Sequence, residues 1–154
     1  SVREEIGFGP RALGVDDDEV ARRVNEMVRL FDLYDVEDMP AAALSSGEQR
    51  AVALACALVM HAPGLVLDEP AAGLDHRLKS RLLNTVARMN QEGTTVIIAT
   101  EDADLIQRYC SHAARLDQGR LVSYGRVRAN GRRFLAPPPV QGVLAASNGK
   151  GVAR

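Results

Sequence analysis

Two acidic residues follow a short apolar run in this 154-residue chain. Asp68 and Glu69 come directly after residues 65–67, Leu-Val-Leu, and precede Pro70. Ligands of open α/β sheets bind beyond the carboxyl ends of the strands, so the pair would lie at a reactive position if 65–67 is a strand. One carboxylate could hold a cation while the other accepts a proton from water. The pattern also fits a strand that simply leaves the core, so alone it does not identify an enzyme.

A second candidate site lies at residues 45–47, Ser-Ser-Gly, which open a predicted apolar helix over residues 50–60. Backbone amides at a helix N-terminus, together with small hydroxyl side chains, favour an anion such as phosphate. Gly47 would let that anion approach the backbone closely. The alternative is structural, because Ser45 or Ser46 could simply cap the helix.

The surrounding elements are expected to alternate between helix and strand. An amphipathic helix is predicted over residues 16–33, with Asp16 as its N-cap and Glu19 as the reciprocal capping partner. Further elements are predicted as a strand at 65–67 buried on both faces, a helix over 78–89, a strand at 94–99, a helix over 105–110, and a hairpin of 113–117 with 121–124. This alternation favours a parallel α/β sheet.

The composition is that of an ordinary globular domain, with 46% hydrophobic residues and a net charge of −1. Aromatic residues make up 4% and Trp is absent, so base stacking has little material and a nucleic-acid partner is not expected. Cys56 and Cys110 lack metal-type spacing, which favours a reducing, cytoplasmic compartment. Neither a membrane-spanning segment nor a signal peptide is predicted.

The chain is expected to divide into three segments, 1–62, 63–125 and 126–154, the last of which is marked by its composition. From Arg126 onward there are six basic residues, no acidic ones, and three consecutive prolines at 137–139. This segment is predicted to be mostly disordered. Its short apolar pairs at 134–135 and 143–144 could dock on another surface.

Three segments, in this order and spacing, resemble the ATP-binding cassette (ABC) ATPases. Residues 44–49 (LSSGEQ) resemble the signature loop of that family, 65–70 (LVLDEP) its Walker B strand, and 72–75 (AGLD) its D-loop. Residues 2–10, followed by Leu13 and Gly14, resemble the segment after the Q-loop in cobalt, nickel and vitamin importers of the energy-coupling-factor type. The resemblance covers residues 2–125.

The resemblance implies a P-loop NTPase-like parallel sheet flanked by helices, with 1–62 holding part of the helical subdomain and ending in the signature helix. It implies that Asp68 supports Mg²⁺, usually through water, and that Glu69 is the general base for the water that attacks ATP. The signature loop would bind the ATP of an opposite subunit. The residues involved would be Ser45, Ser46, Gly47, Glu48 and Gln49, of which Ser46 and Gly47 would contact the γ-phosphate. The D-loop would lie at the dimer seam, through residues Gly73, Leu74 and Asp75.

The same resemblance implies two kinds of partner. One is a second ABC ATPase subunit, and the other is a transmembrane coupling subunit, contacted by the region 22–39. The protein is therefore expected at the cytoplasmic face of the membrane.

Two departures from the family pattern limit what the chain can do alone. The chain has no G-x-x-x-x-G-K-[ST] phosphate-binding loop, which the family places upstream of Ser1, so the fold is expected to be incomplete. Glu101 stands after the second predicted strand, where the family has a histidine that contacts the γ-phosphate. A carboxylate there would repel phosphate unless it is protonated or turned away.

Three hypotheses follow. The chain is the C-terminal portion of an ABC importer ATPase, inactive alone; or it is a degenerate half that lends its signature loop to a competent partner; or, less favoured, it is a cassette ATPase of DNA repair or translation. Missing strands would leave the strand at 65–67 with an unpaired edge and uncovered side chains. We therefore expect marginal stability, which a cooperative melt like that of a complete domain, followed by circular dichroism, would contradict.

Overall fold

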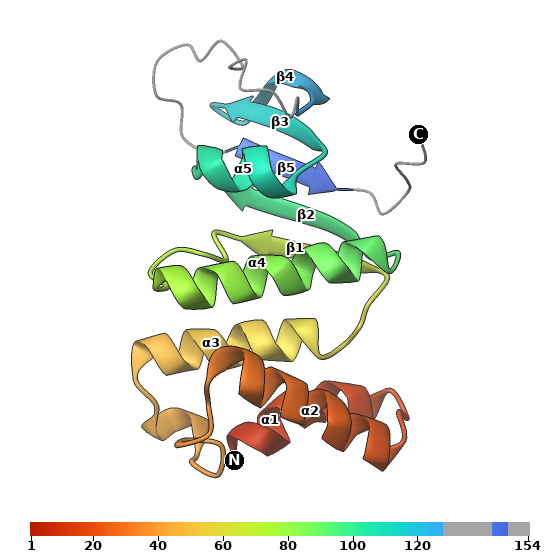
Figure 1. Cartoon of the computed structure of the whole chain (residues 1–154), viewed down its shortest axis with the longest axis vertical. Helices are drawn as coiled ribbons and strands as arrows, with labels where there is room; N and C mark the ends of the chain where they lie inside the picture. Colours follow the sequence, from red (N-terminus) through yellow and green to blue (C-terminus); the bar gives the residue numbers. More distant parts are fainter. Residues whose placement is uncertain (128–142, 148–154) are drawn as a thin grey trace. The chain divides into compact units, whose positions relative to one another are not determined.

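The computed structural model describes residues 1–127 and the backbone of residues 143–147, and the chain divides into two compact units (Figure 1). The first unit comprises residues 1–62 and 73–82, and the second comprises residues 63–72 and the chain from Leu83 onward. The first unit is helical, whereas the second is organised around a β-sheet.

Helices make up the first unit, namely α1 (Val2–Ala12), α2 (Asp17–Phe31), the short 3-10 helix η1 (Ala41–Ala43), α3 (Ser46–Leu58) and the start of α4 (His76–Gln91). Buried apolar residues recur three or four positions apart in α1, α2 and α3, which puts them on one face of each helix. They include Val2, Ile6, Val20, Val24, Met27, Val28, Ala51, Val52, Ala55 and Leu58. These faces form the core of the first unit.

Helix α1 is an element that the sequence pattern did not predict. Ser1 and Glu4 form a capping box at its start, in which the Ser1 hydroxyl accepts the Glu4 amide and the Glu4 carboxylate accepts the Ser1 backbone nitrogen. Pro10 lies in its last turn. Gly9 allows a close approach to Met60, because an added side chain at Gly9 would run into the Met60 sulfur.

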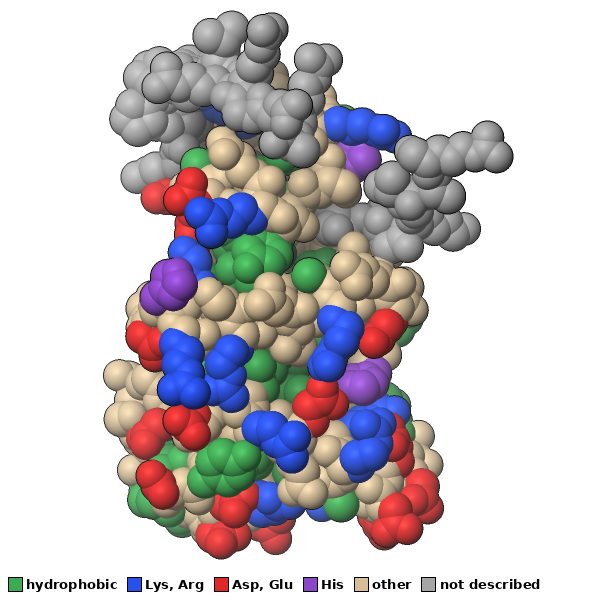
Figure 2. Space-filling view, in the orientation of Figure 1, with side chains coloured by type: hydrophobic (Ala, Val, Ile, Leu, Met, Phe, Trp, Pro, Cys, Tyr) green, Lys and Arg blue, Asp and Glu red, His purple; other side chains and the backbone are tan. Residues whose placement is uncertain are grey.

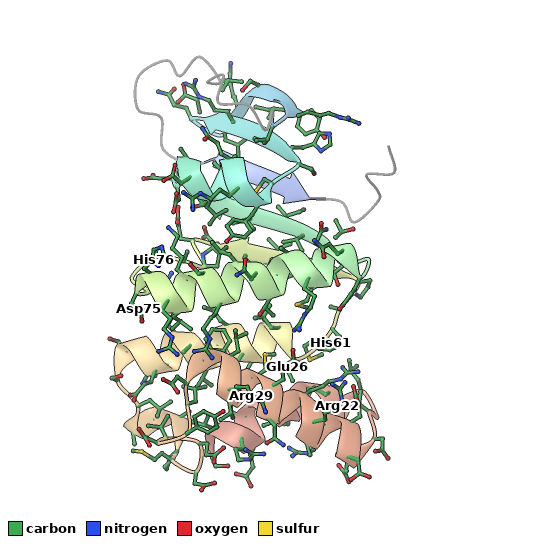
Figure 3. All side chains as sticks on the ribbon, viewed as in Figure 1. Arg22, Glu26, Arg29, His61, Asp75 and His76 are labelled. Carbon is green, nitrogen blue, oxygen red and sulfur yellow. The ribbon has the colours of Figure 1, made fainter. Side chains whose placement is uncertain are left out.

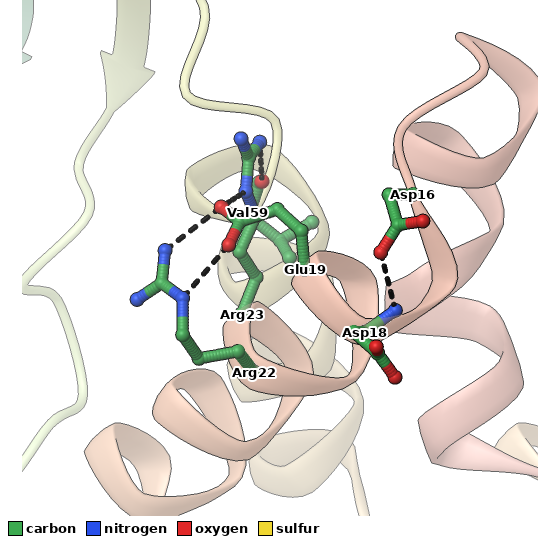
Figure 4. A network of polar contacts seen from close by, with 6 residues as sticks. All are labelled: Asp16, Asp18, Glu19, Arg22, Arg23 and Val59. Carbon is green, nitrogen blue, oxygen red and sulfur yellow. Dashed lines mark hydrogen bonds and ion pairs between the residues drawn. The ribbon is translucent and has the colours of Figure 1, made fainter.

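Helix α2 begins at an N-cap formed by Asp16, whose side chain accepts a hydrogen bond from the Asp18 amide at 3.0 Å (Figure 4). The prediction that Asp16 caps this helix is confirmed. The prediction that Glu19 reaches back to the cap is wrong, because the Glu19 carboxylate binds cationic side chains further along the helix.

Glu19 accepts hydrogen bonds from Arg22 at 2.8 Å and from Arg23 at 2.6 Å (Figure 4). These hydrogen bonds lower the pKa of the Glu19 carboxyl to about 2. Arg23 also donates to the Val59 carbonyl at the end of α3, at 3.4 Å. Arg23 thus links the acidic start of α2 to the carboxyl end of α3, where a cation is favourable.

The second unit contains the strands β1 (Gly64–Asp68), β2 (Thr95–Thr100), β3 (His112–Asp117), β4 (Arg120–Arg126) and β5 (Val143–Ser147), helix α5 (Ala103–Tyr109) and residues 83–91 of α4. The strand order is β1-β2-β5-β3-β4. Strands β1 and β2 are parallel, as predicted, but β5 is antiparallel to both β2 and β3. The sheet of the described residues is therefore mixed rather than wholly parallel.

Five residues of the segment 126–154, which was predicted to be mostly disordered, form strand β5. Its backbone pairs with β2 on one side and β3 on the other, and β4 extends through Arg126. The segment supplies backbone partners to strands that would otherwise keep unpaired amides and carbonyls. The apolar pair at 134–135 and the prolines at 137–139 lie outside the described residues.

Strand β1 forms the edge of the sheet, because β2 is its one partner among the described strands. The expected unpaired edge is thus confirmed. Leu65 and Leu67 are buried, whereas Val66, between them on the opposite face of the strand, is 73% exposed. The prediction of burial on both faces is wrong, because no described element covers the Val66 face.

The predicted hairpin is confirmed by the antiparallel pairing of β3 with β4. Its turn has positive φ at Gln118 (47°) and Gly119 (75°), as two-residue hairpin turns of type I′ require. The rings of His112 and Tyr124 stack across the two strands with centroids 5.8 Å apart.

Candidate functional site

The first turn of α3 carries the candidate anion site and is organised by its own side chains. Ser45 is the N-cap, and its hydroxyl accepts the Glu48 amide at 3.4 Å. The Glu48 carboxylate in turn accepts the Ser45 amide at 2.8 Å and the Ser45 hydroxyl at 2.5 Å. These bonds lower the pKa of Glu48 and place a negative charge at the positive end of the helix dipole. The capping interpretation of Ser45 is therefore confirmed.

Ser46 and Gly47 are the members of this turn that face solvent without a partner. Both are exposed, and within residues 1–127 neither the Ser46 hydroxyl nor their backbone amides has a hydrogen-bond partner. The Gln49 side chain instead donates to the Leu44 carbonyl at 3.2 Å. Of the five predicted loop residues, Ser45, Glu48 and Gln49 stabilise the turn, whereas Ser46 and Gly47 leave donors available to a ligand.

The acidic pair follows β1 as predicted, but its two members have different surroundings. Asp68 is the last residue of the strand and is exposed, and its carboxylate has no partner among the described residues. Glu69 is half-buried and adopts a left-handed backbone, with φ of 42°. Its amide donates to the Ala99 carbonyl of β2 at 2.8 Å. The backbone thus turns directly after β1 and directs Glu69 toward the end of β2.

The Glu69 carboxylate is held from both oxygens by the residues that end β2. Oε2 lies 3.0 Å from the Thr100 hydroxyl, and Oε1 accepts the Glu101 amide at 2.7 Å. Thr100 is buried, with 2% of its surface exposed. Thr100 was not predicted as a site residue, although a hydroxyl at the last position of an apolar strand is a signal that could have indicated it.

Glu101 does not place its carboxylate on Glu69. Its side chain is exposed, and its contribution to the site is the backbone amide. Asp102, next in the chain, caps α5 by accepting the Leu105 amide at 3.0 Å. The described contacts therefore show Glu101 as a main-chain donor to Glu69.

The predicted D-loop turns at Gly73, which has φ of 74°, and leads into α4. Asp75 accepts the Leu78 amide at 2.9 Å and so serves at the start of α4 as a cap (Figure 3). Leu74 is half-buried. Gly73 and Asp75 are exposed, as a residue at an interface between subunits must be in the single chain.

The described residues fit a magnesium–nucleotide complex in part. Asp68 offers an unengaged carboxylate, and Mg²⁺ is typically bound through one or two carboxylates together with substrate phosphates. Within residues 1–127 no group of three or more His, Cys, Asp and Glu side chains could hold a metal by itself. The sequence also lacks a phosphate-binding loop. Asp68 is therefore the described carboxylate that could contact such a metal.

Other features are consistent with packing. A shallow hollow in the second unit is lined by Val86, Ile98, Tyr109, Cys110 and neighbouring residues, none of which was predicted as a site residue. Burial raises the pKa of the Cys110 thiol to about 11, which makes it unreactive. No helix of the described residues has the length and apolarity needed to cross a membrane. On the face drawn in Figure 2, basic side chains of the first unit alternate with acidic ones.

The chain is similar in sequence to known proteins. Residues 4–106 match the family described as "AAA domain, putative AbiEii toxin, Type IV TA system". A protein of Methanothermobacter marburgensis, named as a putative ABC transporter ATP-binding protein, is 40% identical over 124 residues, which are 80% of this chain and 45% of that protein. The energy-coupling factor transporter ATP-binding protein EcfA of Carboxydothermus hydrogenoformans is 35% identical over 125 residues, 81% of this chain and 46% of that protein.

The chain is also similar to a solved structure. The structure of cbiO1 from Clostridium perfringens, described as part of the ABC transporter complex cbiONQ, superposes with a TM-score of 0.62 at 35% identity. The match covers 82% of this chain and 51% of that one. The chain thus spans about half the length of each of these three proteins.

Proposed function

Because the chain belongs to the ABC-type ATP-binding proteins, we propose that it is the C-terminal part of an importer ATPase subunit. In this proposal, ATP binding and hydrolysis by the complete cassette drive transport of a metal ion or a vitamin. The names of the relatives, an energy-coupling factor protein and a cbiO protein, support an importer of this kind.

The observation that supports the proposal most directly is the orientation of the Glu69 carboxylate. An acidic side chain follows β1 at the carboxyl edge of a sheet, and two donors hold its carboxylate in one orientation. A general base must be oriented toward the proton that it accepts, and it must be charged. Two donors orient the Glu69 carboxylate, whereas the Glu101 side chain is exposed and contributes only its backbone amide to the described contacts.

ATP and Mg²⁺ are the cofactors of the proposed reaction. Asp68 would hold Mg²⁺ through water, and the metal would neutralise charge on the phosphates. Glu69 would accept a proton from the attacking water. Ser46 and Gly47 would donate hydrogen bonds to the γ-phosphate of ATP held by a second ABC ATPase subunit.

The remaining expectations concern partners and location. A second ATPase subunit would supply the opposite half-site, with Asp75 near the seam between subunits. A transmembrane coupling subunit would bind the helical unit and select the transported substrate. The chain would then act at the cytoplasmic face of the cell membrane.

A second candidate function is that the chain lends its signature loop to a competent partner without hydrolysing ATP itself. One observation favours it: Glu101 stands at the position where the family has a histidine. The exposed donors of Ser46 and Gly47 would suffice for this role.

Mixing the chain with a complete partner subunit and measuring ATP turnover distinguishes the two functions. Ser46→Arg blocks the signature loop and should abolish stimulation of the partner under both. Glu69→Gln, in a chain with an intact signature loop, should lower ATP turnover only if this chain contributes the general base for hydrolysis. If neither variant changes turnover, both proposals are wrong.

A further inference from the structure

The hydroxyl of Thr100 has a defined direction in this structure. It accepts the Asp102 amide at 3.1 Å and lies 3.0 Å from Glu69 Oε2. An amide can only donate, and an ionised carboxylate can only accept. The single hydroxyl proton of Thr100 is therefore directed at Glu69, and the Asp102 amide orients the hydroxyl that carries it.

Thr100 and Glu101 together fix the plane of the Glu69 carboxylate. The Thr100 hydroxyl binds one oxygen and the Glu101 amide binds the other, from consecutive positions of the chain. Thr100 is 2% exposed, so water cannot readily replace its hydroxyl. Hydrogen bonds of this linked kind strengthen one another in a weakly polar surrounding.

We propose that Thr100 is a positioning residue for Glu69. Its hydroxyl, oriented by the Asp102 amide, holds the Glu69 carboxylate in the direction from which it accepts a proton from water. This inference rests on the proposed role of Glu69 in ATP hydrolysis, but the contact itself can be tested without that role.

A residue that acts through the base should change the rate of the chemical step more than the binding of substrate. Removal of the Thr100 hydroxyl should therefore lower kcat and leave KM for ATP nearly unchanged. A residue that only stabilises the fold would instead reduce the amount of active protein, without a selective effect on kcat per folded molecule.

Three variants isolate the hydroxyl. Thr100→Val removes it at nearly constant volume, and Thr100→Ser keeps it while removing the methyl group. Thr95→Val is the matched control, because Thr95 begins the same strand and is exposed. If Thr100→Val loses its cooperative melt, Thr100→Ala replaces it.

The first measurement is steady-state ATP turnover by the chain assembled with a polypeptide that supplies the phosphate-binding loop. Thr100→Val should lower kcat about tenfold or more, with KM within twofold, because a bond to a charged group is lost. Thr100→Ser should restore most of kcat, and Thr95→Val should match the unaltered protein. An unchanged kcat in folded Thr100→Val, measured where Glu69→Gln is inactive, overturns the positioning role.

The second measurement uses the chain by itself and does not depend on catalysis. Amide hydrogen exchange, followed by NMR, should be about tenfold faster at Glu101 in Thr100→Val than in Thr100→Ser, because the Glu69 acceptor is no longer held. Unchanged exchange at Glu101 overturns the contact. If exchange changes as expected but Glu69→Gln retains full ATP turnover, the contact stands and the proposed function of Glu69 is wrong.

Discussion

The first turn of α3 and the ends of β1 and β2 contain similar hydrogen-bond arrangements, which differ in the sequence separation of the residues that form them. Each holds a glutamate carboxylate against a hydroxyl and a backbone amide. Glu48 binds Ser45, three residues earlier, whereas Glu69 binds Thr100 and Glu101, which follow it by 31 and 32 residues. The first arrangement needs only one helical turn, while the second needs two strands paired in register.

The two carboxylates also differ in what their hydrogen bonds stabilise. Glu48 closes a capping box, and its charge stabilises the helix that carries it. Glu69 has a left-handed backbone, and its amide and its carboxylate bind groups at the end of β2, far along the chain. Strain kept in place by distant contacts is typical of functional positions, whereas the Ser45–Glu48 pair is typical of helix ends.

The largest expected effect comes from breaking the sheet at β5. Ala145 is paired with Ile98 of β2 and with Ala113 of β3, and Ala145→Pro removes an amide from that ladder. We expect a loss of about 2 to 3 kcal/mol in unfolding free energy of the second unit. Amide exchange should accelerate at Glu101 but not at Glu48.

Ala145→Val is the control, since it keeps the amide and favours a strand. Hydrogen exchange read by mass spectrometry reports both regions in one experiment. Equal acceleration at Glu101 and Glu48 would show that the two arrangements do not differ as described.

A smaller effect is expected at the helix cap. Ser45→Ala removes the N-cap hydroxyl and should lower the unfolding free energy by about 1 kcal/mol in urea titrations. Ser46→Ala is the matched control, because the neighbouring hydroxyl has no partner within residues 1–127, and its change should be a few tenths of a kcal/mol at most. Equal losses in the two variants would contradict the capping assignment.

The smallest expected effect concerns acid stability of the first unit. The pKa of Glu19 is lowered from 4.5 to about 2 by Arg22 and Arg23. A carboxyl with a lowered pKa in the folded state stabilises above its ordinary value, so this contribution is complete above pH 4.5 and disappears as the pH falls toward 2. Melting temperatures of the parent and Glu19→Gln should differ at pH 6 and converge near pH 2. A constant difference over that range would be evidence against the pair.

Local contacts made much of the fold predictable. The cap at Asp16, the turn at Ser45 and the hairpin turn at Gly119 depend on neighbouring residues, and the structure has them at the expected positions. The strand that ends in Asp68 is short and apolar, and its parallel pairing with β2 was also expected.

The errors arose where distant groups decide the outcome. Glu19 could bind its own cap, but two arginines offer it stronger charge-assisted bonds. Val66 lies in an apolar run and was therefore expected to be buried. It is exposed, because burial would need an element that covers its face of the sheet. The strand at residues 143–147, which pairs with two others, was not predicted, because the segment after Arg126 shows no sustained strand periodicity.

The candidate site shows the same division. Asp68 and Glu69 could be located from their position after an apolar run. Thr100 could not be linked to Glu69 without the register of β1 with β2, because nothing in the sequence states which residues of two strands lie opposite each other.

The most direct test of the account is single-turnover hydrolysis of radiolabelled ATP by the assembled cassette, with Glu69 or Gln at position 69. We predict that Glu69→Gln retains ATP binding and lowers the hydrolysis rate by about 100-fold or more, as loss of a general base should. Hydrolysis by Glu69→Gln at the rate of the unaltered protein would contradict the central claim that Glu69 is the catalytic carboxylate.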